Sequence, residues 1–517
     1  MSAAPALLLA LLTCVPARAA SIRLFAFDGR SAPYTAEGLA TLLSRADARA
    51  PSLDTLPLWA VPMDGKSPRR RLALAPDENI VRGSWEHTPR VRLELIWPVF
   101  EDGYNSVVAD NNGEGFIDGD TVYLDEEIAV TQYRRFKDMW KRRISDWQPL
   151  YKPTKKAKDL SDAAKDAMAA AAREKDTPSR AKLYKRALNL VSLAWQHVLF
   201  EHALQHGLDE RHAPTQRFGL TIDEGILKRL DDLDWIVKAV HRSGANWVRL
   251  VFRANSGDFT YSSLRSFNEY DGVVELLSAK RIKVMGCILD TTQWPKTLTP
   301  GRYAERVKNI VLHYRGKISS WEVGSEINGD WLGGVGAPLS IEDAYKIYSS
   351  GVDKVKEIDP ALETVATLYG WEETAPDVEH SVSGWLERHA KHGFGRNLDI
   401  VGLSVQPEDN PAGMGLERLF TIVSDAMPAQ KLMLTSLGFV EKDTLQGYWW
   451  LDPHDIDGAR KDIAVLYTAV SCAMPRSLCG AFWWQTLEQM LPPGRRKGTE
   501  LFKAWRRVLG QFGRRED

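Results

Sequence analysis

Apolar and polar positions alternate in a regular way over roughly the last 300 residues of the chain. Short apolar runs, suited to buried strands, are each followed by a longer segment with apolar residues three or four positions apart, which is typical of an amphipathic helix. The first helical stripe consists of Ile226, Leu230, Leu233, Val237 and Val240. The alternation therefore predicts repeated strand–helix units.

Eight such units follow one another from residue 215 onward. The expected strands are Gln216–Ile222, Asn246–Arg253, Ile282–Leu289, Lys317–Glu326, Glu363–Tyr369, Leu398–Gln406, Lys431–Leu437 and Leu478–Trp484. The helices expected after the later strands are Leu264–Lys280, Arg302–Tyr314, Ile341–Ile358, Asp377–Lys391, Leu416–Met427, Gly458–Met474 and Glu500–Gln511. Eight units in this length are typical of a TIM barrel, whereas a doubly wound sheet rarely needs so many and binds phosphate through a glycine cluster that is missing after the first strand here. We predict a (β/α)8 barrel of the α/β class over residues 215–517.

The segment 21–214 shows no such regular alternation. We expect strands at Ile22–Phe27 and Val91–Phe100, and a helix at Thr35–Ala46. Three further helical segments are Leu124–Asp146, Leu160–Lys175 and Ser179–His206. The basic run at 66–71 is predicted to be a solvated loop. The sequence thus predicts a mixed α+β accessory domain that ends in a helical hairpin.

The first 20 residues resemble a secretory signal. They are apolar from Pro5 to Val15 and end in a small-x-small cleavage motif before Ser21. We therefore expect export, to a periplasmic or extracellular location. No later apolar run reaches the ~18 residues that a membrane helix requires, so no membrane span is predicted.

Charge and composition limit the classes of molecule that the protein is expected to bind. The formal net charge is -1, with 67 basic and 68 acidic residues, so no basic domain suggests a nucleic-acid partner. The 18 Trp residues are many, and a flat apolar ring with one donor suits stacking on sugar rings. A carbohydrate is therefore the partner that the composition favours.

Metal and cofactor signals are weak. The segment from Asp110 to Asp118 resembles a calcium loop, but Thr121 stands where a bidentate Glu is needed, so a metal-free turn is favoured. Cys472 and Cys479 flank a helix-to-strand connection and could pair, and no His neighbours complete a zinc pattern. We predict no metal and no cofactor.

Residues with reactive or hydrogen-bonding side chains occur at the carboxyl ends of the expected strands, where barrels hold their active sites. The third, sixth and eighth ends contribute carboxylates: Asp290, Glu408, Asp409 and Glu488. The stretch Lys317–Gly334 (K-I-S-S-W-E-V-G-S-E-I-N-G-D-W-L-G-G) runs from an apolar strand into a turn rich in Gly, Asn and Asp, and Glu326 lies at the change. An isolated Glu there would be read as a helix cap, but several carboxylates, amides and Trp residues on one rim favour a sugar site.

Three motifs carry a family resemblance. W-V-R-L places Arg249 on the second strand, W-E-V-G-S-E-I-N-G-D-W places Glu326 at the end of the fourth, and G-A-F-W-W-Q places Trp484 at the end of the eighth. In this order they resemble the large clan of retaining glycoside hydrolases built on TIM barrels. The resemblance covers about 300 of the 517 residues. It implies that Glu326 is the general acid/base, with substrate-binding positions at Arg249, Ser325, Asn328, Gln406, Glu408, Ser436 and Trp484.

Three positions depart from that family. Ser325 precedes the acid/base where the family has Asn, and Gln406 stands at the sixth-strand position where the family has an aromatic residue or His. Ser436 stands where the family has the nucleophilic Glu. A retaining enzyme needs two carboxyl groups ~5–5.5 Å apart, and an inverting one needs them ~6.5–9.5 Å apart. A second carboxylate would then come from Asp290, Glu322, Glu408, Asp409 or Glu488.

Three functions remain open at this point. The first, which we favour, is a glycoside hydrolase that uses Glu326 and a carboxylate on another loop. The second is a sugar-binding barrel that has lost turnover. The third is a structural partner in an exported polysaccharide assembly.

Overall fold

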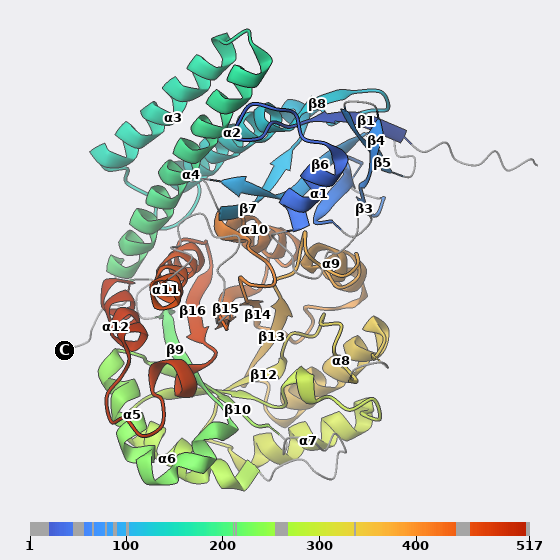
Figure 1. Cartoon of the computed structure of the whole chain (residues 1–517). Coiled ribbons are helices and arrows are strands. Elements are labelled where there is room, and N and C mark those ends of the chain that lie inside the picture. Colours follow the sequence, from blue (N-terminus) through green and yellow to red (C-terminus); the bar gives the residue numbers. More distant parts are fainter. Residues whose placement is uncertain are drawn as a thin grey trace, which may run out of the picture.

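The computed structural model describes residues 20–44, 56–64, 67–77, 80–85, 90–99, 103–209, 211, 215–253, 267–334, 338–440 and 455–512. Eight parallel strands close into a barrel, in chain order, with the last strand paired to the first (Figure 1). The strands are β9 (Arg217–Ile222), β10 (Trp247–Val251), β11 (Lys283–Cys287), β12 (Ser320–Gly324), β13 (Glu363–Tyr369), β14 (Ile400–Val405), β15 (Lys431–Leu437) and β16 (Ser477–Trp483). The predicted barrel is confirmed, and β13 and β15 have the predicted bounds.

Helices surround the barrel, as expected from their apolar stripes. They are α5 (Leu233–Ser243), α6 (Asp271–Ala279), α7 (Pro300–His313), α8 (Ile341–Ile358), α9 (Val382–His389), α10 (Leu416–Ala426), α11 (Ile456–Cys472) and α12 (Glu500–Phe512). Each buries an apolar face against the strands. The helix α8 has the predicted bounds, because Ser340 accepts a hydrogen bond from the backbone N–H of Asp343 and so fixes its start.

Two expected helices begin later than their stripes indicate. The segment Glu224–Asp232 is a 3-10 helix in which only Ile226 is buried, and Arg229 breaks the helical geometry at φ -132° before α5 begins. The predicted stripe places Leu230 four positions after Ile226, which suits an α-helix, but the 3-10 period of three residues turns Leu230 away from Ile226, and Leu230 is 57% exposed. The helix α9 begins at Val382 because the Ser381 side chain caps it. Of the expected helix Leu264–Lys280, residues 264–266 lie outside the described part.

Two four-stranded sheets precede the barrel. One has the order β4 (Ala73–Asp77), β5 (Ile80–Trp85), β1 (Ala20–Phe25), β8 (Thr121–Tyr123), and the other has the order β3 (Arg70–Arg71), β2 (Leu58–Pro62), β6 (Val91–Val99), β7 (Gly103–Ala109). The helix α1 (Ala36–Ser44) packs beside them, and their apolar residues form a core of their own. Most of these strands were not predicted, because they are short and lack a regular alternation.

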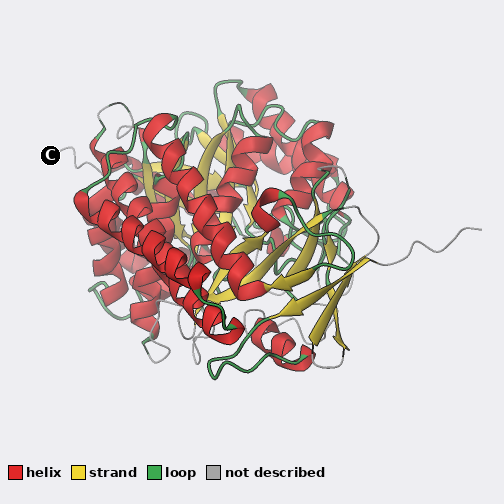
Figure 2. Ribbon diagram, turned by 90° about the horizontal axis from the view of Figure 1, so that it is seen from above, coloured by secondary structure: helices red, strands yellow, loops and turns green. Residues whose placement is uncertain are grey.

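Three long helices join the sheets to the barrel. They are α2 (Leu124–Ser145), α3 (Lys155–Arg173) and α4 (Thr177–Leu208), and α3 and α4 form the predicted hairpin (Figure 1). Phe136 of α2 and Trp195 of α4 belong to the same apolar cluster as the barrel residues. Seen from above, the N-terminal strands lie beside a layer of long helices (Figure 2). The helices are therefore part of the barrel's packing.

The basic run at 66–71 was predicted to be a solvated loop, and its described residues 67–71 are partly buried. Arg69 is 6% exposed, lies 4.2 Å from the ring centre of Trp59 and forms an ion pair with Glu372, which follows β13. Trp59 in turn donates a hydrogen bond of 2.7 Å to the carbonyl of Glu373. Arg69 thus links the N-terminal sheet to a barrel loop, because a buried guanidinium needs a carboxylate partner and carbonyl acceptors.

In the calcium-like loop, the first acidic residue, Asp110, is bonded to neighbouring groups of the protein. The Asp110 carboxylate accepts hydrogen bonds from the backbone N–H of Gly113 and from Thr131, and it forms an ion pair with Arg134. In the described part of the chain, no group of three or more His, Cys, Asp or Glu side chains is arranged to hold a metal ion.

Two further predictions concern cysteines and membranes. Cys472 and Cys479 form a disulfide, while Cys287 is a buried free thiol. None of the described helices combines the length and the apolar character needed to cross a bilayer.

Candidate active site

The predicted site residues come from five strands whose carboxyl ends face the same side of the barrel. Arg249 lies on β10, Ser436 lies on β15, and the others follow β12, β14 and β16. Because the strands are parallel and closed into a ring, their ends form one rim. The structure therefore brings the predicted residues to one end of the barrel.

Deep in this end lies a fully buried ion pair. The Arg249 Nε atom donates to Glu322 Oε2 at 2.7 Å, and both side chains are about 1% exposed or less. The second Glu322 oxygen accepts a hydrogen bond from Thr367, and Arg249 Nη2 donates to Ser325 Oγ at 3.0 Å. Burial opposes the charge of Arg249, but Glu322 raises its pKa well above the ordinary range. Glu322 is thus a structural partner of Arg249, and Ser325 orients the guanidinium.

Glu326 lies two residues beyond the end of β12, in a different environment. Its backbone has φ 56°, a left-handed conformation that non-glycine residues rarely adopt. Its Oε1 atom accepts a hydrogen bond of 2.6 Å from Ser404 Oγ, and its side chain is partly exposed. Burial raises the pKa of Glu326 to about 7, and the negative charge of Asp290 adds to this increase, while Ser404 and Arg249 oppose it. Near neutral pH a large fraction of Glu326 therefore carries a proton.

Asp290 follows β11 and keeps its charge. Its Oδ2 atom accepts a hydrogen bond of 3.1 Å from Arg253, and its Oδ1 atom accepts one of 2.9 Å from the backbone N–H of Thr292. Burial alone would raise the pKa of Asp290, but Arg253 and Thr292 lower it below its ordinary value. Glu326 and Asp290 thus interact, and their surroundings move their pKa values in opposite directions.

Trp484 lies beside both arginines. The guanidinium carbons of Arg249 and Arg253 lie 5.2 Å and 4.8 Å from its ring centre, a distance at which cation–π attraction operates. Trp484 is partly exposed, whereas the neighbouring Trp483 is buried and donates its indole N–H to Gln489 at 2.9 Å. Of these two Trp residues, only Trp484 presents a surface to a ligand.

The other predicted positions differ in what they offer. The Asn328 side chain is fully buried and bonds to the backbone of Tyr369 and His380, so its amide fixes the loop after β13. Glu408 accepts a hydrogen bond of 2.8 Å from the backbone N–H of Val440. Gln406 is partly exposed and lies against the backbone of Gly438.

Ser436 lies at the end of β15 and is 1% exposed. Its hydroxyl has no hydrogen-bond partner among the described residues. It therefore places an unused hydroxyl, and no carboxylate, at this position of the rim.

Two contributors were not among the predicted site residues. Ser404 is the direct partner of Glu326, and Arg253 is the partner of Asp290. Ser404 has the same strand parity as Gln406, so its inward direction follows from the two-residue period of a strand. Arg253 ends the predicted second strand, but its pairing with Asp290 depends on how neighbouring strands are aligned.

Comparisons with known proteins were made at three levels. No protein-family model matches this chain, and no curated protein sequence matches it. Among solved structures, a GH10 endoxylanase from a sugarcane soil metagenome is 14% identical, with a TM-score of 0.40 over 57% of this chain and 98% of the other. Xylanase 10B from Thermotoga maritima is 12% identical, with a TM-score of 0.41 over 58% and 97%.

A family 39 glycoside hydrolase from Bacteroides cellulosilyticus is also 12% identical, with a TM-score of 0.39 over 56% of this chain and 62% of the other. These values are too low to carry an argument about function. An argument about function therefore has to rest on the side chains at the rim of the barrel.

Proposed function

We propose that the protein is a carbohydrate-active enzyme, a glycoside hydrolase that cleaves an O-glycosidic bond of an oligosaccharide or polysaccharide. The observation that carries the proposal is the pair Glu326 and Asp290. One carboxyl group has a pKa raised to about 7, and its neighbour has a lowered pKa. Two interacting carboxyl groups whose pKa values are driven apart are the basis of acid and base assignments in sugar hydrolysis.

In this proposal Glu326 is the general acid. Its proton passes to the glycosidic oxygen as the bond to the anomeric carbon breaks. A water molecule adds its oxygen to the anomeric carbon and gives up a proton, so that one water is consumed for each bond cleaved. The charge of Asp290 stabilises the oxocarbenium-like transition state, and we assign Asp290 as the group toward which the proton of water moves.

The remaining carboxylates fit this role less well. Glu322 is fully buried against Arg249 and Thr367, and Asp409 accepts a hydrogen bond of 2.6 Å from the Tyr369 hydroxyl. Asp290 also has hydrogen-bond partners, but each carboxylate oxygen has a second lone pair that can accept from water. Its charge acts directly on the pKa of Glu326.

The test is turnover on a panel of plant and bacterial polysaccharides, with product analysis. Glu326→Gln should abolish turnover and leave binding of the glycan mostly intact, because the amide keeps the size but cannot donate a proton. The kcat/KM of the unmodified enzyme should fall as the pH rises above about 7, where Glu326 loses its proton. Unchanged turnover in the variant would remove Glu326 from the mechanism.

Sugar binding is assigned to Trp484. If a sugar ring stacks on its exposed surface, Trp484→Ala should weaken binding by ~1–3 kcal/mol, by analogy with the stacking of nucleobases on aromatic side chains. Affinity should be measured by calorimetry with the glycan that the panel identifies. An unchanged affinity would mean that Trp484 supports only the two arginines.

A second candidate function is sugar binding without turnover. It is favoured by Ser436, which places no carboxylate at the end of β15, and by Asp290, which is only 2% exposed. Binding of a glycan without any product, in the unmodified protein, would select this function. In that case Glu326→Gln would change neither product nor affinity.

We also propose export. The first strand begins at Ala20, next to the cleavage motif, and Cys472 and Cys479 form a disulfide of the kind that persists in oxidising compartments. Mass spectrometry of the secreted or periplasmic fraction should find a chain that begins near Ala20 or Ser21. A chain that keeps its first 19 residues would contradict this proposal.

A further inference from the structure

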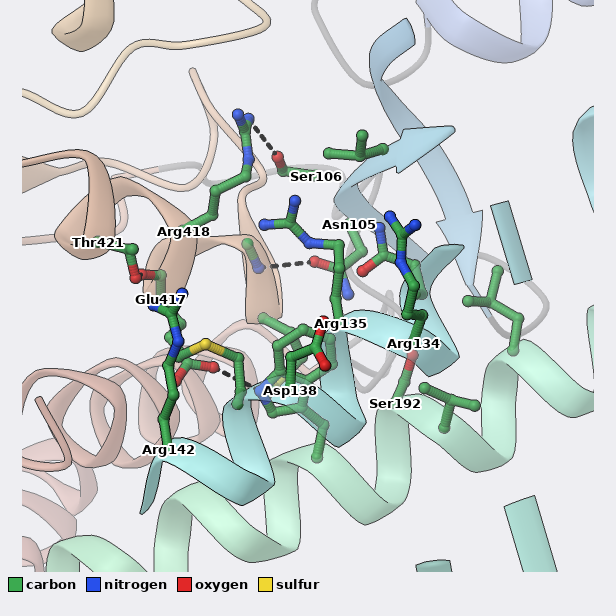
Figure 3. A pocket seen from close by; sticks show the side chains of 18 of the residues that line it. Asn105, Ser106, Arg134, Arg135, Asp138, Arg142, Ser192, Glu417, Arg418 and Thr421 are labelled. Carbon is green, nitrogen blue, oxygen red and sulfur yellow. Dashed lines mark hydrogen bonds between the residues drawn. The ribbon is translucent and has the colours of Figure 1, made fainter. Parts of the chain in front are cut away.

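A pocket of about 430 Å³ lies away from the barrel strands, between the N-terminal sheet and the outer helices (Figure 3). Its walls come from strand β7, from helices α2, α4 and α10, and from the short 3-10 turn Gly413–Gly415 before α10. The volume is within the range of small-molecule sites in proteins. None of the residues assigned above to the barrel site lines it.

One part of this pocket is apolar and another part is polar. Leu188, Val191 and Trp195 of α4 form the apolar wall. Opposite them, Gln132 and Arg135 lie one turn apart on α2, and Ser192 of α4 completes the polar part. Gln132 is 8% exposed and Ser192 is 4% exposed. Within the described part of the chain, no hydrogen bond or ion pair is formed by the side chains of these three residues.

The other charged groups in the interior of the pocket form ion pairs. Arg418 pairs with Glu94 at 2.9 Å and with Glu373, and Arg134 pairs with Asp110. Glu417 forms an ion pair with Arg143 and accepts a hydrogen bond from Trp195. At the outer edge, the exposed side chains of Asp138, Arg142 and Asp425 are solvated.

Arg135 is therefore the guanidinium that remains. Figure 3 shows it rising from α2 among the lining residues, between Arg418 and Arg134. Burial and the charge of Arg418 lower the pKa of Arg135 to about 10, while the charges of Glu94 and Asp110 oppose this change, so Arg135 still carries its charge at neutral pH. Arg135 is only partly exposed, and within the described part of the chain Glu94 and Asp110 form their ion pairs with other arginines. An anion in the pocket would give Arg135 a direct partner.

We propose that this pocket binds a small organic oxyanion, with its carboxylate, sulfate or phosphate group on Arg135 and its hydroxyl groups on Gln132 and Ser192. The planar guanidinium binds such a group through two parallel hydrogen bonds. The amide of Gln132 both donates and accepts, and so does the hydroxyl of Ser192, which matches the hydroxyl groups of a sugar-sized molecule. The apolar wall of α4 then contacts the body of the ligand.

The experiment measures binding by calorimetry and by the shift in melting temperature. The probes are glucuronate, glucose 6-phosphate, inorganic phosphate and, as the neutral counterpart, glucose. Glucuronate or glucose 6-phosphate should bind and raise the melting temperature, and glucose should do neither. The affinity should fall as salt concentration rises. Preference for glucuronate identifies a carboxylate ligand, and preference for the sugar phosphate identifies a phosphorylated one. Failure of both sugar anions to bind better than glucose would overturn the proposal, as would inorganic phosphate binding as tightly as either of them.

The decisive variant is Arg135→Gln, which should weaken anion binding about 10-fold to 100-fold, the loss expected for a hydrogen bond between two charged groups. Arg135→Lys should retain part of the affinity, since the charge remains but the two parallel bonds are lost. The matched control is Lys141→Gln, which removes one charge from the exposed part of the same helix and should leave binding unchanged.

Two further measurements keep the result interpretable. Arg135 forms no ion pair in the described part of the chain, and the net effect of its surroundings disfavours its charge, so Arg135→Gln should melt at the same or a higher temperature than the unmodified protein. A lower melting temperature would indicate a structural role for Arg135 and would contradict the proposal. Trp484→Ala should leave anion binding intact. Loss of anion binding in that variant would move the ligand to the barrel rim and overturn the assignment to this pocket.

Discussion

The barrel rim and the pocket beside α10 are both rich in arginines and carboxylates, and they differ in which group remains without a counter-charge. At the rim, Arg249 pairs with Glu322 and Arg253 pairs with Asp290, so the remaining group is the acid Glu326. In the pocket, the neighbouring arginines have acidic partners and the remaining group is Arg135.

The two remaining groups respond to burial in different ways. A carboxyl group removes its charge by binding a proton, and burial raises the pKa of Glu326 to about 7. Arginine cannot do the same at neutral pH, and the pKa of Arg135 falls only to about 10. An acid in such surroundings therefore becomes a proton donor without a counter-charge, whereas an arginine keeps its charge and is stabilised by an anion. This difference separates a site for proton transfer from a site for binding.

The largest expected effect comes from breaking the ion pair below the rim. Arg249→Met should destabilise the protein by about 3–5 kcal/mol, because Glu322 is then left buried without its counter-charge. Urea unfolding at pH 7 measures this loss. The matched control is the double variant Arg249→Met with Glu322→Leu, which should recover most of the stability. A double variant as unstable as the single one would show that the pair does not act as a unit.

The next effect depends on pH and tests the neutral state of Glu326. Below about pH 4.5 this carboxyl group is protonated in both the folded and the unfolded chain, so its contribution to stability is fully present. As the pH rises toward 7, only the unfolded chain ionises, and the folded state becomes less stable. Glu326→Gln does not titrate. Its stability relative to the unmodified protein should therefore increase between pH 4.5 and pH 7, by roughly 2–3 kcal/mol in total.

Unfolding curves at pH 4.5, 6 and 8 for both proteins give this difference directly. Asp290→Asn removes the neighbouring negative charge, so it should narrow the pH range over which the difference grows. A stability difference that stays constant with pH would mean that Glu326 titrates normally in the folded protein.

The barrel could be predicted from the sequence because each of its units repeats the same two periods. The helix α8 and the strand β13 kept their predicted bounds, since a capping Ser and clear changes of polarity mark their ends. The segment Glu224–Asp232 was predicted as α-helix and is a 3-10 helix, in which the period of three residues turns Leu230 of the predicted stripe away from Ile226, and Leu230 is 57% exposed.

The sequence predicted more of the barrel rim than of the pocket beside α10. The positions of Arg249, Glu326 and Trp484 followed from strand order alone. The pKa of Glu326 could not be predicted in this way, because it depends on burial and on the charge of Asp290, which follows the neighbouring strand β11. Arg135 gave no signal, since it occurs in a charged helical stretch that is typical of a solvated surface.

The smallest expected effect concerns the hydrogen bond from Ser404 to Glu326. That bond favours the ionised carboxylate and so lowers the pKa of Glu326, against the larger effect of burial. Ser404→Ala should therefore raise this pKa further, by roughly half to one pH unit, as the loss of about 0.5–1.5 kcal/mol implies. The measurement is the pH midpoint of the stability difference between Ser404→Ala and the double variant that also carries Glu326→Gln. If the midpoint moved to lower pH, Ser404 would have to accept a hydrogen bond from the protonated acid, and the proton of Glu326 would then be directed away from a sugar.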